Sequence, residues 1–268
     1  MDLSIIIPSY NTKKLLKECL NSLKKNKGKL SIEIIVVDNG STDSSVDYLK
    51  KTSKDEMIQI ILLDQNWGFA GAVNKGIKEA RGKFLLLLNS DTQIQKETLK
   101  KAIEFAQNHP QAIVGLQLVN FDGSIQPSVY HFPSLRRAIK EFWLGQKDSY
   151  QKYFPKTKKA IKVDAVTGAV MFIPKKIIKK IGLFDEKYFF YFEDLDYCRR
   201  ARKVGLKVYY LPPAQVFHHH GAAGKAMPEI THQWLVESSK KYNGLVKYYL
   251  LTLIIWLGQK WRRLTGKK

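Results

Sequence analysis

Short apolar runs and amphipathic segments alternate through the first third of this chain. The apolar runs are Leu3–Ile7, Ile32–Val37, Ile58–Leu63 and Phe84–Leu88. The segment after Thr12 repeats leucines on one helical face, and further helices are expected around Ser44–Lys51 and Ala70–Arg81. Strands that alternate with helices at this spacing pair in parallel through right-handed crossovers. We therefore expect an α/β sandwich.

Each apolar run ends in a cluster of polar residues. The four clusters are Pro8-Ser9-Tyr10-Asn11, Asp38-Asn39-Gly40-Ser41-Thr42, Asp64-Gln65-Asn66-Trp67-Gly68 and Asn89-Ser90-Asp91. In open α/β sheets, ligands bind outside the carboxyl ends of the strands, so these clusters indicate a site that includes Asp91. Asn, Ser and Asp also form local turns, and this alternative remains open for Asn39 and Ser41.

The chain lacks the glycine patterns of two common nucleotide-binding loops. No G-x-G-x-x-G follows the first strand and no G-x-x-x-x-G-K-[ST] is present, which disfavours a dinucleotide dehydrogenase and a P-loop ATPase. The clusters supply acids, amides and hydroxyls instead, with Tyr10 as a stacking surface. Such a set suits the base and ribose of a nucleotide, with a carboxylate left for a metal ion on phosphates.

The formal net charge of +21 points to an anionic partner. A nucleic-acid-binding protein would carry a groove-reading module, and the sequence contains none that we recognise, so we expect no nucleic acid. A nucleotidyltransferase on a similar core would carry a basic triphosphate loop near the N-terminus. That enzyme class and a non-catalytic nucleotide-binding α/β protein remain the alternatives.

Five sequence blocks follow one another along the chain. They are "SIIIPSYNTKKLLKECLNSL", "EIIVVDNGSTDSS", "NWGFAGAVNKGI", "FLLLLNSDT" and a long block from "VTGAVMFIPKK" to "VYYLPPAQVFHHHG". Together they resemble glycosyltransferase family 2, and the last block is similar to its rhamnosyltransferase-like branch. The resemblance implies a GT-A fold, a Rossmann-like nucleotide-binding α/β/α sandwich with a mixed central sheet. It implies a glycosyltransferase domain over 1–225, with a nucleotide-sugar half (1–92) and an acceptor half (93–225), and a basic amphipathic helical tail (226–268).

The resemblance implies an enzyme that moves rhamnose or another hexose from a UDP- or dTDP-sugar. The acceptor would be a hydroxyl of a glycan or lipid-linked glycan in cell-surface polysaccharide synthesis. Asp38 would hold the base or the ribose, Gly68 would let backbone approach the donor, and Lys75 would reach a phosphate or remain a solvated lysine. The implied donor-binding residues are Pro8, Tyr10, Asn11, Asp38, Asn39, Ser41, Gly68, Ala72, Asn74, Lys75, Asn89, Ser90 and Asp91.

Metal binding is expected at the Asn-Ser-Asp motif that ends at Asp91. The family has Asp-x-Asp at this place, so Asp91 is its only formally charged ligand here, and Asn89 would bond the ribose or a water molecule. A single anionic ligand predicts weak, exchangeable binding of Mn²⁺ or Mg²⁺. The family's metal-binding histidine matches His218, although a histidine tract also suits a polar strand end. His220 would share its side of the strand, and His219 is the least suited ligand.

The resemblance places the catalytic base at Asp194, with Glu193 contacting the acceptor or orienting the site. Flanking aromatic residues would desolvate these acids and raise their pKa. A helix start, the alternative reading, accounts best for Asp196, which would pair with Arg199 or Arg200. With one base and no evident nucleophile opposite, the reaction should invert the anomeric centre. The residues expected beside the acceptor or the donor sugar are Gly168, Ala169 and Glu193, with Gly168 on a further strand.

The C-terminal segment combines cations with apolar residues. No acid follows Glu237, and the apolar run Tyr248–Leu257 is about half of what a membrane span requires. Such a segment suits a helix in the interface of an anionic membrane, although a core-packing terminal helix remains an alternative. A loop-like segment, roughly 126–162, adds positive charge for a lipid diphosphate or polyanionic glycan acceptor. The two unrelated cysteines and the absence of signal-peptide features favour the cytoplasm, so we expect a peripheral protein on the inner face of the cell membrane.

Overall fold

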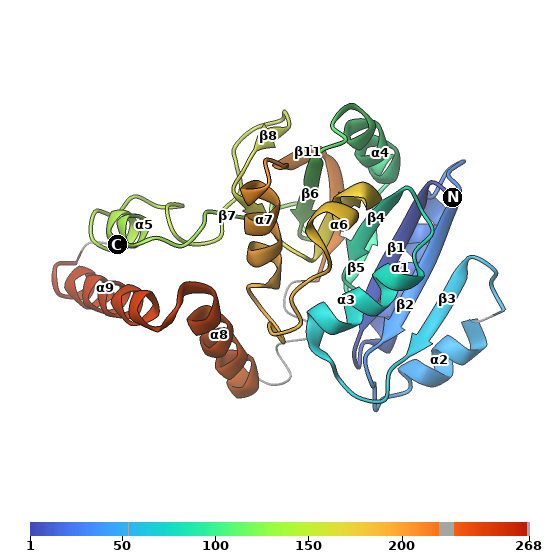
Figure 1. Ribbon diagram of the computed structural model, residues 1–268, viewed down its shortest axis with the longest axis horizontal. Helices are drawn as coiled ribbons and strands as arrows, with labels where there is room; N and C mark the ends of the chain where they lie inside the picture. Colours follow the sequence, from blue (N-terminus) through green and yellow to red (C-terminus); the bar gives the residue numbers. More distant parts are fainter. Residues whose placement is uncertain (53, 220–227, 267–268) are drawn as a thin grey trace.

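The computed structural model describes residues 1–52, 54–219 and 228–266, and Figure 1 shows their arrangement. A central sheet carries helices on both faces, and three further helices, α5, α8 and α9, lie to one side of this body (Figure 1). The helices are α1 (Lys13–Asn26), α2 (Ser45–Thr52), α3 (Gly68–Glu79), α4 (Thr98–Asn108), α5 (Leu135–Phe142), α6 (Lys175–Ile181), α7 (Glu193–Lys203), α8 (Pro228–Asn243) and α9 (Leu245–Leu264).

The main sheet is mixed and has the strand order β3-β2-β1-β4-β10-β6-β11-β5, with β8 paired to β11. Strands β3, β2, β1 and β4 are parallel, β10 runs antiparallel to β4 and β6, β11 is parallel to β6, and β5 is antiparallel to β11. A second, small sheet pairs β7 with β9. The strand bounds are β1 (Leu3–Ser9), β2 (Ile32–Asp38), β3 (Ile58–Leu62), β4 (Phe84–Leu88), β5 (Thr92–Ile94), β6 (Ala112–Val119), β7 (Val129–Tyr130), β8 (Ile161–Lys162), β9 (Ala165–Val166), β10 (Val170–Pro174) and β11 (Lys207–His218). The predicted α/β sandwich with a mixed sheet is confirmed.

The continuous leucines of β4 are explained by its position in the sheet. This strand is central in the sheet, between β1 and β10, and its two faces belong to two different core clusters. Leu86 joins the core cluster that includes Leu16 and Leu20 of α1, while Leu85 joins the cluster that includes Val73 of α3. A strand buried on both faces needs apolar residues at every position.

Two sequence expectations about the second half of the chain are wrong. The segment 126–162 is not simply loop-like, because it contains helix α5, which Ser134 caps by accepting a hydrogen bond from the Arg137 backbone N–H. Gly168 does not lie on a strand. It occupies the turn between β9 and β10, where its backbone N–H is free to bond a side chain rather than a neighbouring strand.

Helices α8 and α9 are both held by packing contacts. The Ser238 hydroxyl of α8 donates to the Phe190 carbonyl, while Leu251 of α9 packs against Phe142 of α5. A Cβ at Gly258 would lie 2.9 Å from the Phe142 Cβ, so this glycine permits the close approach of α9 to α5. Among the described residues, no helix combines the length and apolar character that a membrane crossing requires.

Candidate active site

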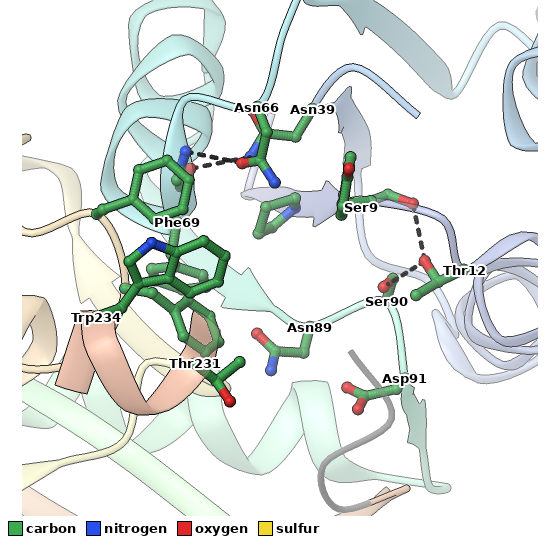
Figure 2. A pocket seen from close by; sticks show the side chains of 15 residues that line it. Ser9, Thr12, Asn39, Asn66, Phe69, Asn89, Ser90, Asp91, Thr231 and Trp234 are labelled. Atoms are coloured by element: carbon green, nitrogen blue, oxygen red, sulfur yellow. Dashed lines mark hydrogen bonds between the residues drawn. The ribbon is translucent and has the colours of Figure 1, made fainter. Parts of the chain in front are cut away.

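The polar strand ends meet at one edge of the sheet, as Figure 2 shows. The hydroxyls of Ser9 and Thr12 are 3.0 Å apart, and those of Thr12 and Ser90 are 2.8 Å apart. Thr12 precedes α1 but makes no side-chain capping bond. Its hydroxyl instead ties the end of β1 to the end of β4, which run side by side. A polar residue that the sequence presents as a helix start is therefore part of the floor of a pocket.

Two asparagines shape this edge by binding neighbouring loops. The Asn39 amide donates to Asn66 Oδ1 and to the Gly68 carbonyl, and its oxygen accepts from the Trp67 N–H. Asn11, with φ of +53°, accepts from the backbone of Thr42 and Asp43. The backbone N–H of Asn11 donates to the hydroxyl of Ser41. The side chains of Asn39 and Ser41 thus bond distant loops rather than their own turn, and these bonds fix the loops that border the pocket.

Asp38 is buried at the end of β2 and makes an incomplete set of hydrogen bonds. Its Oδ1 accepts from the Ser41 N–H at 2.9 Å. Its Oδ2 is buried and has no hydrogen-bond partner in the part of the chain that the structure describes. A buried acceptor left in this condition is costly unless a ligand or water donates to it.

A first cavity of about 120 Å³ lies beside these strand ends. In Figure 2, Phe69 and Trp234 stand on one side of it and Ser9, Thr12 and Ser90 on the other. Trp234 comes from α8 and contacts the ring of Phe189, with centroids 4.6 Å apart. Of the predicted donor residues, Pro8, Tyr10, Asn39, Gly68, Asn89, Ser90 and Asp91 line this cavity. Ser9 and Asn66, which belong to the polar clusters, line it as well. The lining residues that the sequence did not indicate are Thr12, Phe69, Phe189, Phe190, Thr231 and Trp234.

Three predicted donor contacts, Ala72, Asn74 and Lys75, do not line the first cavity. Ala72 is fully buried in the core, and Lys75 places its Nζ 5.4 Å from the centre of the Trp67 ring. Asn74 donates both amide hydrogens, to the Phe184 carbonyl and to Glu186, and accepts from the Phe184 N–H. Its amide therefore joins α3 to the segment before α7. Gly68 is required for another reason, because a Cβ there would lie 2.2 Å from the Phe189 carbonyl oxygen.

Asp91 and His218 meet although they belong to opposite halves of the sequence. Strands β5 and β11 pair antiparallel with His218 opposite Thr92, which brings His218 Nε2 to 3.4 Å from Asp91 Oδ1. His218 Nδ1 lies 2.8 Å from Gln126 Oε1, so the ring presents its other nitrogen to Asp91. Oδ1 of Asp91 and Oδ1 of Asn89 are buried and accept no hydrogen bond from the described residues. The predicted juxtaposition of Asp91 and His218 is present.

The neighbouring histidines differ from His218. His219 places its Nε2 3.6 Å from Glu18 Oε2 and packs its ring on Phe121. It therefore points away from the Asp91 side chain, while its backbone N–H donates to the Asp91 carbonyl. His220 lies outside the described residues. Within those residues, no three histidine, cysteine or acidic side chains gather as a preformed metal cage.

Glu193 and Asp194 begin helix α7 and are buried, each with 6% of its surface exposed. Tyr191 and Phe192 before them have φ of +69° and +66°, a left-handed conformation that costs about 1–3 kcal/mol per residue and is concentrated at functional sites. Asp194 accepts from the Gly168 and Leu195 N–H groups at 3.0 and 2.8 Å. These residues thus hold a carboxylate in one orientation at a helix start.

Burial raises the pKa of both acids. For Glu193 the negative charge of Asp194 raises the pKa further, and its Oε2 has no hydrogen-bond partner among the described residues. For Asp194 the Gly168 N–H, the Lys152 ammonium and the Leu195 N–H partly offset burial. These three groups favour the ionised form of Asp194. Asp196 points elsewhere, toward Arg199 at 3.0 Å and Arg200 at 2.7 Å, as predicted.

A second cavity of about 640 Å³ connects these groups, and we call it the acceptor cavity. Asp194, Glu193, Asp91 and His218 all line it, so the carboxylate pair and the Asp91–His218 pair share one space. Phe69, Asn89, Asp91 and Phe190 also line the first cavity, which makes the two cavities neighbours. Other residues that line the acceptor cavity are Tyr130, Lys152, Gly168 and Ala169, together with Ile255 and Gln259 of α9.

Residues 4–182 match the model of the family described as glycosyl transferase family 2. A poly(ribitol-phosphate) β-N-acetylglucosaminyltransferase, TarS of Staphylococcus aureus, is 35% identical over 125 residues, 46% of this chain and 22% of that protein's length. An N-acetylglucosaminyl-diphospho-decaprenol L-rhamnosyltransferase of Mycobacterium tuberculosis is 26% identical over 70% of this chain and 66% of its own length. The crystal structure of GalNAc-T7 with UDP, GalNAc and Mn²⁺ has the same fold, with a TM-score of 0.64 and 15% identity over 81% of this chain and 44% of that chain.

Proposed function

The chain belongs to glycosyl transferase family 2, and from this premise we propose that it transfers a hexose from a UDP- or dTDP-sugar to a hydroxyl of a lipid-linked glycan, with inversion. The observation that carries the proposal is the shared cavity, in which a buried carboxylate pair faces the Asp91–His218 pair beside the polar strand ends. The carboxylate pair can take a proton there, and the Asp91–His218 pair can hold a charged leaving group.

The donor nucleotide is assigned to the strand ends because of their unsatisfied acceptors. Asp38 Oδ2 is buried without a partner in the described chain, and a pyrimidine ring N–H is a suitable donor to it. Tyr10 lines the first cavity and offers an aromatic surface for stacking. UDP is bound in the structure of GalNAc-T7, which has the same fold.

A divalent ion, Mn²⁺ or Mg²⁺, is assigned to Asp91 and His218, with Asn89 beside them. The buried Oδ1 atoms of Asp91 and Asn89 accept no hydrogen bond from the described residues, and carboxylate, amide and imidazole groups suit these metals. When bound, the ion supplies positive charge that stabilises the leaving diphosphate. Gln126 fixes the ring of His218, which is the usual role of a group behind a metal-binding histidine.

Asp194 is assigned as the general base. The acceptor hydroxyl gives its proton to the Asp194 carboxylate while its oxygen bonds the anomeric carbon and the bond from that carbon to the diphosphate breaks. Gly168 and Leu195 hold the carboxylate still, and Lys152 favours its ionised form. Glu193, whose pKa is raised further, is assigned to acceptor positioning and can donate a hydrogen bond from its protonated form. A single displacement inverts the anomeric centre.

Peripheral attachment to an anionic membrane is supported by the two faces of α9. Its inner face packs on α5, and its outer face leaves large apolar side chains exposed, among them Leu253 at 50% and Trp256 at 55%. Lys260 and Arg263 of the same helix are exposed, whereas Lys247 and Arg262 donate to the carbonyls of Pro133 and Glu141 on the side that packs. A helix with apolar residues and flanking cations suits the interface of an anionic bilayer. We place this interface on the cytoplasmic face of the cell membrane.

The acceptor is assigned to the lipid-linked, phosphate-bearing class. The acceptor cavity reaches from Asp194 to Ile255 and Gln259 on α9, so an acceptor whose lipid remains in the membrane can bring its glycan to the base. The staphylococcal and mycobacterial relatives are both named for acceptors that contain phosphate.

The test is a donor panel of UDP- and dTDP-sugars with Mn²⁺, a polyprenyl-diphosphate-linked glycan as acceptor and mass detection of the product. We expect one donor to add a single hexose to the acceptor. Transfer of a nucleotidyl group from a nucleoside triphosphate, with no hexose transfer, would favour the nucleotidyltransferase alternative.

A further inference from the structure

A cavity of about 370 Å³ adjoins the acceptor cavity and belongs to neither the carboxylate pair nor the Asp91–His218 pair. His131 lines both cavities, and its ring stacks on Tyr153 with centroids 4.5 Å apart. We call this third space the basic cavity. The charged and titratable side chains that line it are His131, Arg137, Lys162, Asp164, Arg202 and Lys207.

One carboxylate, Asp164, organises the basic cavity. Its Oδ2 lies 3.2 Å from His131 Nδ1 and 3.4 Å from Arg137 Nη2, and its Oδ1 accepts from Arg202. Burial opposes ionisation, but the hydrogen bonds from His131 and Arg202 hold the pKa of Asp164 below its usual value. Asp164 therefore stays charged and holds the two guanidinium groups in defined positions.

Four basic side chains surround this single acid. Lys162 of β8 pairs with Tyr209 of β11, and Lys207 lies two residues before Tyr209, so both lysines lie on one face of the ladder. Both are exposed, and neither forms an ion pair among the described residues. With the arginines already matched to Asp164, the lysines leave the basic cavity with an excess of positive charge. A concave site of this kind attracts an oxyanion.

We propose that the basic cavity is a phosphate subsite that binds a phosphoryl oxyanion of the acceptor. This inference rests on the proposed function, because it assigns the subsite to a substrate whose reacting hydroxyl lies in the adjoining acceptor cavity. Guanidinium groups match two phosphate oxygens at once, and lysine ammonium groups add charge without strict geometry. The subsite is separate from the donor diphosphate, which the proposed function assigns to the Asp91–His218 pair.

The first test is titration of inorganic pyrophosphate into the full chain, in EDTA and with saturating UDP. Wild type should bind the probe, and Lys162→Gln combined with Lys207→Gln should weaken binding about tenfold or more, because charge-assisted hydrogen bonds are lost. The matched control is Lys176→Gln with Lys179→Gln, which removes two exposed lysines of α6 that line none of the described cavities. Equal weakening in both double variants, or no binding by wild type, overturns the subsite.

A second arm identifies the source of the phosphate. Retention on phosphatidylglycerol vesicles should be the same for both double variants, because the subsite serves the acceptor. Selective loss by the Lys162/Lys207 variant would assign the cavity to membrane headgroups and overturn the acceptor assignment. In transfer assays the same variant should raise KM for a phosphate-bearing acceptor about tenfold, with kcat and the donor KM unchanged. If no sugar is transferred at all, the proposed function fails, while the pyrophosphate titration still decides the subsite.

Discussion

His218 Nε2 lies 3.4 Å from Asp91 Oδ1, across the antiparallel pair that joins β11 to β5. The contact joins β11, the last strand in the sequence, to the loop that follows β4. Gln126 orients the histidine ring, and the Asp91 carboxylate keeps a buried oxygen that accepts no hydrogen bond from the described chain. These features underlie the metal assignment and make it testable.

Asp91→Ala and His218→Ala should each abolish Mn²⁺-dependent donor turnover and weaken Mn²⁺ binding in the presence of UDP. Gln126→Ala should weaken Mn²⁺ binding about 10–100-fold, because it removes the group that orients His218. Calorimetric titration of Mn²⁺ measures the affinities, with His232→Ala, an exposed histidine on α8, as the control. Wild-type turnover by Asp91→Ala in Mn²⁺ would show that the metal, if one is needed, binds elsewhere.

Three acid-to-amide variants at the start of α7 should separate their roles. Asp194→Asn should lower kcat by about 10²–10⁴ while donor binding changes little, because the amide cannot take a proton. Glu193→Gln should lower kcat less than Asp194→Asn does. Asp196→Asn should mainly lower Tm, because it weakens the bonds to Arg199 and Arg200. Steady-state kinetics beside melting curves give the ranking, and equal losses of kcat in all three would remove Asp194 as the base.

The pH dependence of Glu193→Gln follows from the direction of its pKa shift. Burial, and then the charge of Asp194, raises the pKa of Glu193 in the folded state. The folded protein therefore binds more protons than the unfolded chain between the ordinary and the raised pKa, and wild-type stability falls as pH rises through that window. Glutamine removes this loss, so the Tm of the variant minus that of wild type should increase as pH rises above the ordinary carboxyl pKa. A difference that is constant with pH, or that decreases, contradicts the assignment.

The pH dependence of activity should follow the ionisation of Asp194, the other member of the carboxylate pair. Burial raises the pKa of Asp194, so the active carboxylate form accumulates only above the usual carboxyl range. The kcat/KM profile should rise with pH on its acidic side, and Lys152→Met should shift this limb to higher pH because it removes the charge that favours ionisation. Lys152→Arg should restore the wild-type limb. An acidic limb at the ordinary carboxyl pKa, unchanged by Lys152→Met, would show that the ionisation of Asp194 does not set this limb.

The membrane assignment is best tested by changing the outer face of α9. Leu253→Gln with Trp256→Gln should release the protein from phosphatidylglycerol vesicles without lowering Tm, because both side chains are at least half exposed. High salt should release only part of the wild type, since salt screens the cations but not apolar insertion. Val204→Gln, an exposed apolar residue of the main body, is the control. Removal of 244–268 is a poorer test, because it uncovers Phe142, against which Leu251 packs.

The fold of the first half was predictable because its signals are local. The expected strand Phe84–Leu88 coincides with β4, and a strand covered on both faces requires that uninterrupted apolar run. Helix α5, Leu135–Phe142, was missed because it has only eight residues, although these residues are amphipathic, and its apolar residue Phe142 is covered by a distant segment, α9. The sequence left two alternatives for the C-terminal segment, a membrane-interface helix and a packed terminal helix. These do not exclude each other, because one face of α9 packs and the other is exposed.

Site residues could be predicted where several polar strand ends converge. They were harder to predict where the role of a residue depends on which partner its side chain contacts. An asparagine that binds backbone, such as Asn74, looks the same in sequence as one that binds a ligand. Trp234 was missed because nothing local shows that α8 returns to the strand ends. Ser9 belongs to the first polar cluster and Thr12 directly follows it, so an extension of the predicted site to the whole cluster and the next residue would have included both.

The central claim is a direct displacement at the anomeric carbon with Asp194 as base, and the most direct test is the stereochemistry of the product. The measurement is NMR of the first product formed by the full chain from a donor of known anomeric configuration, with Mn²⁺ and a lipid-linked acceptor. The account predicts the opposite configuration in the new glycosidic bond and no detectable product from Asp194→Asn over the same time. A product that keeps the configuration of the donor would contradict it.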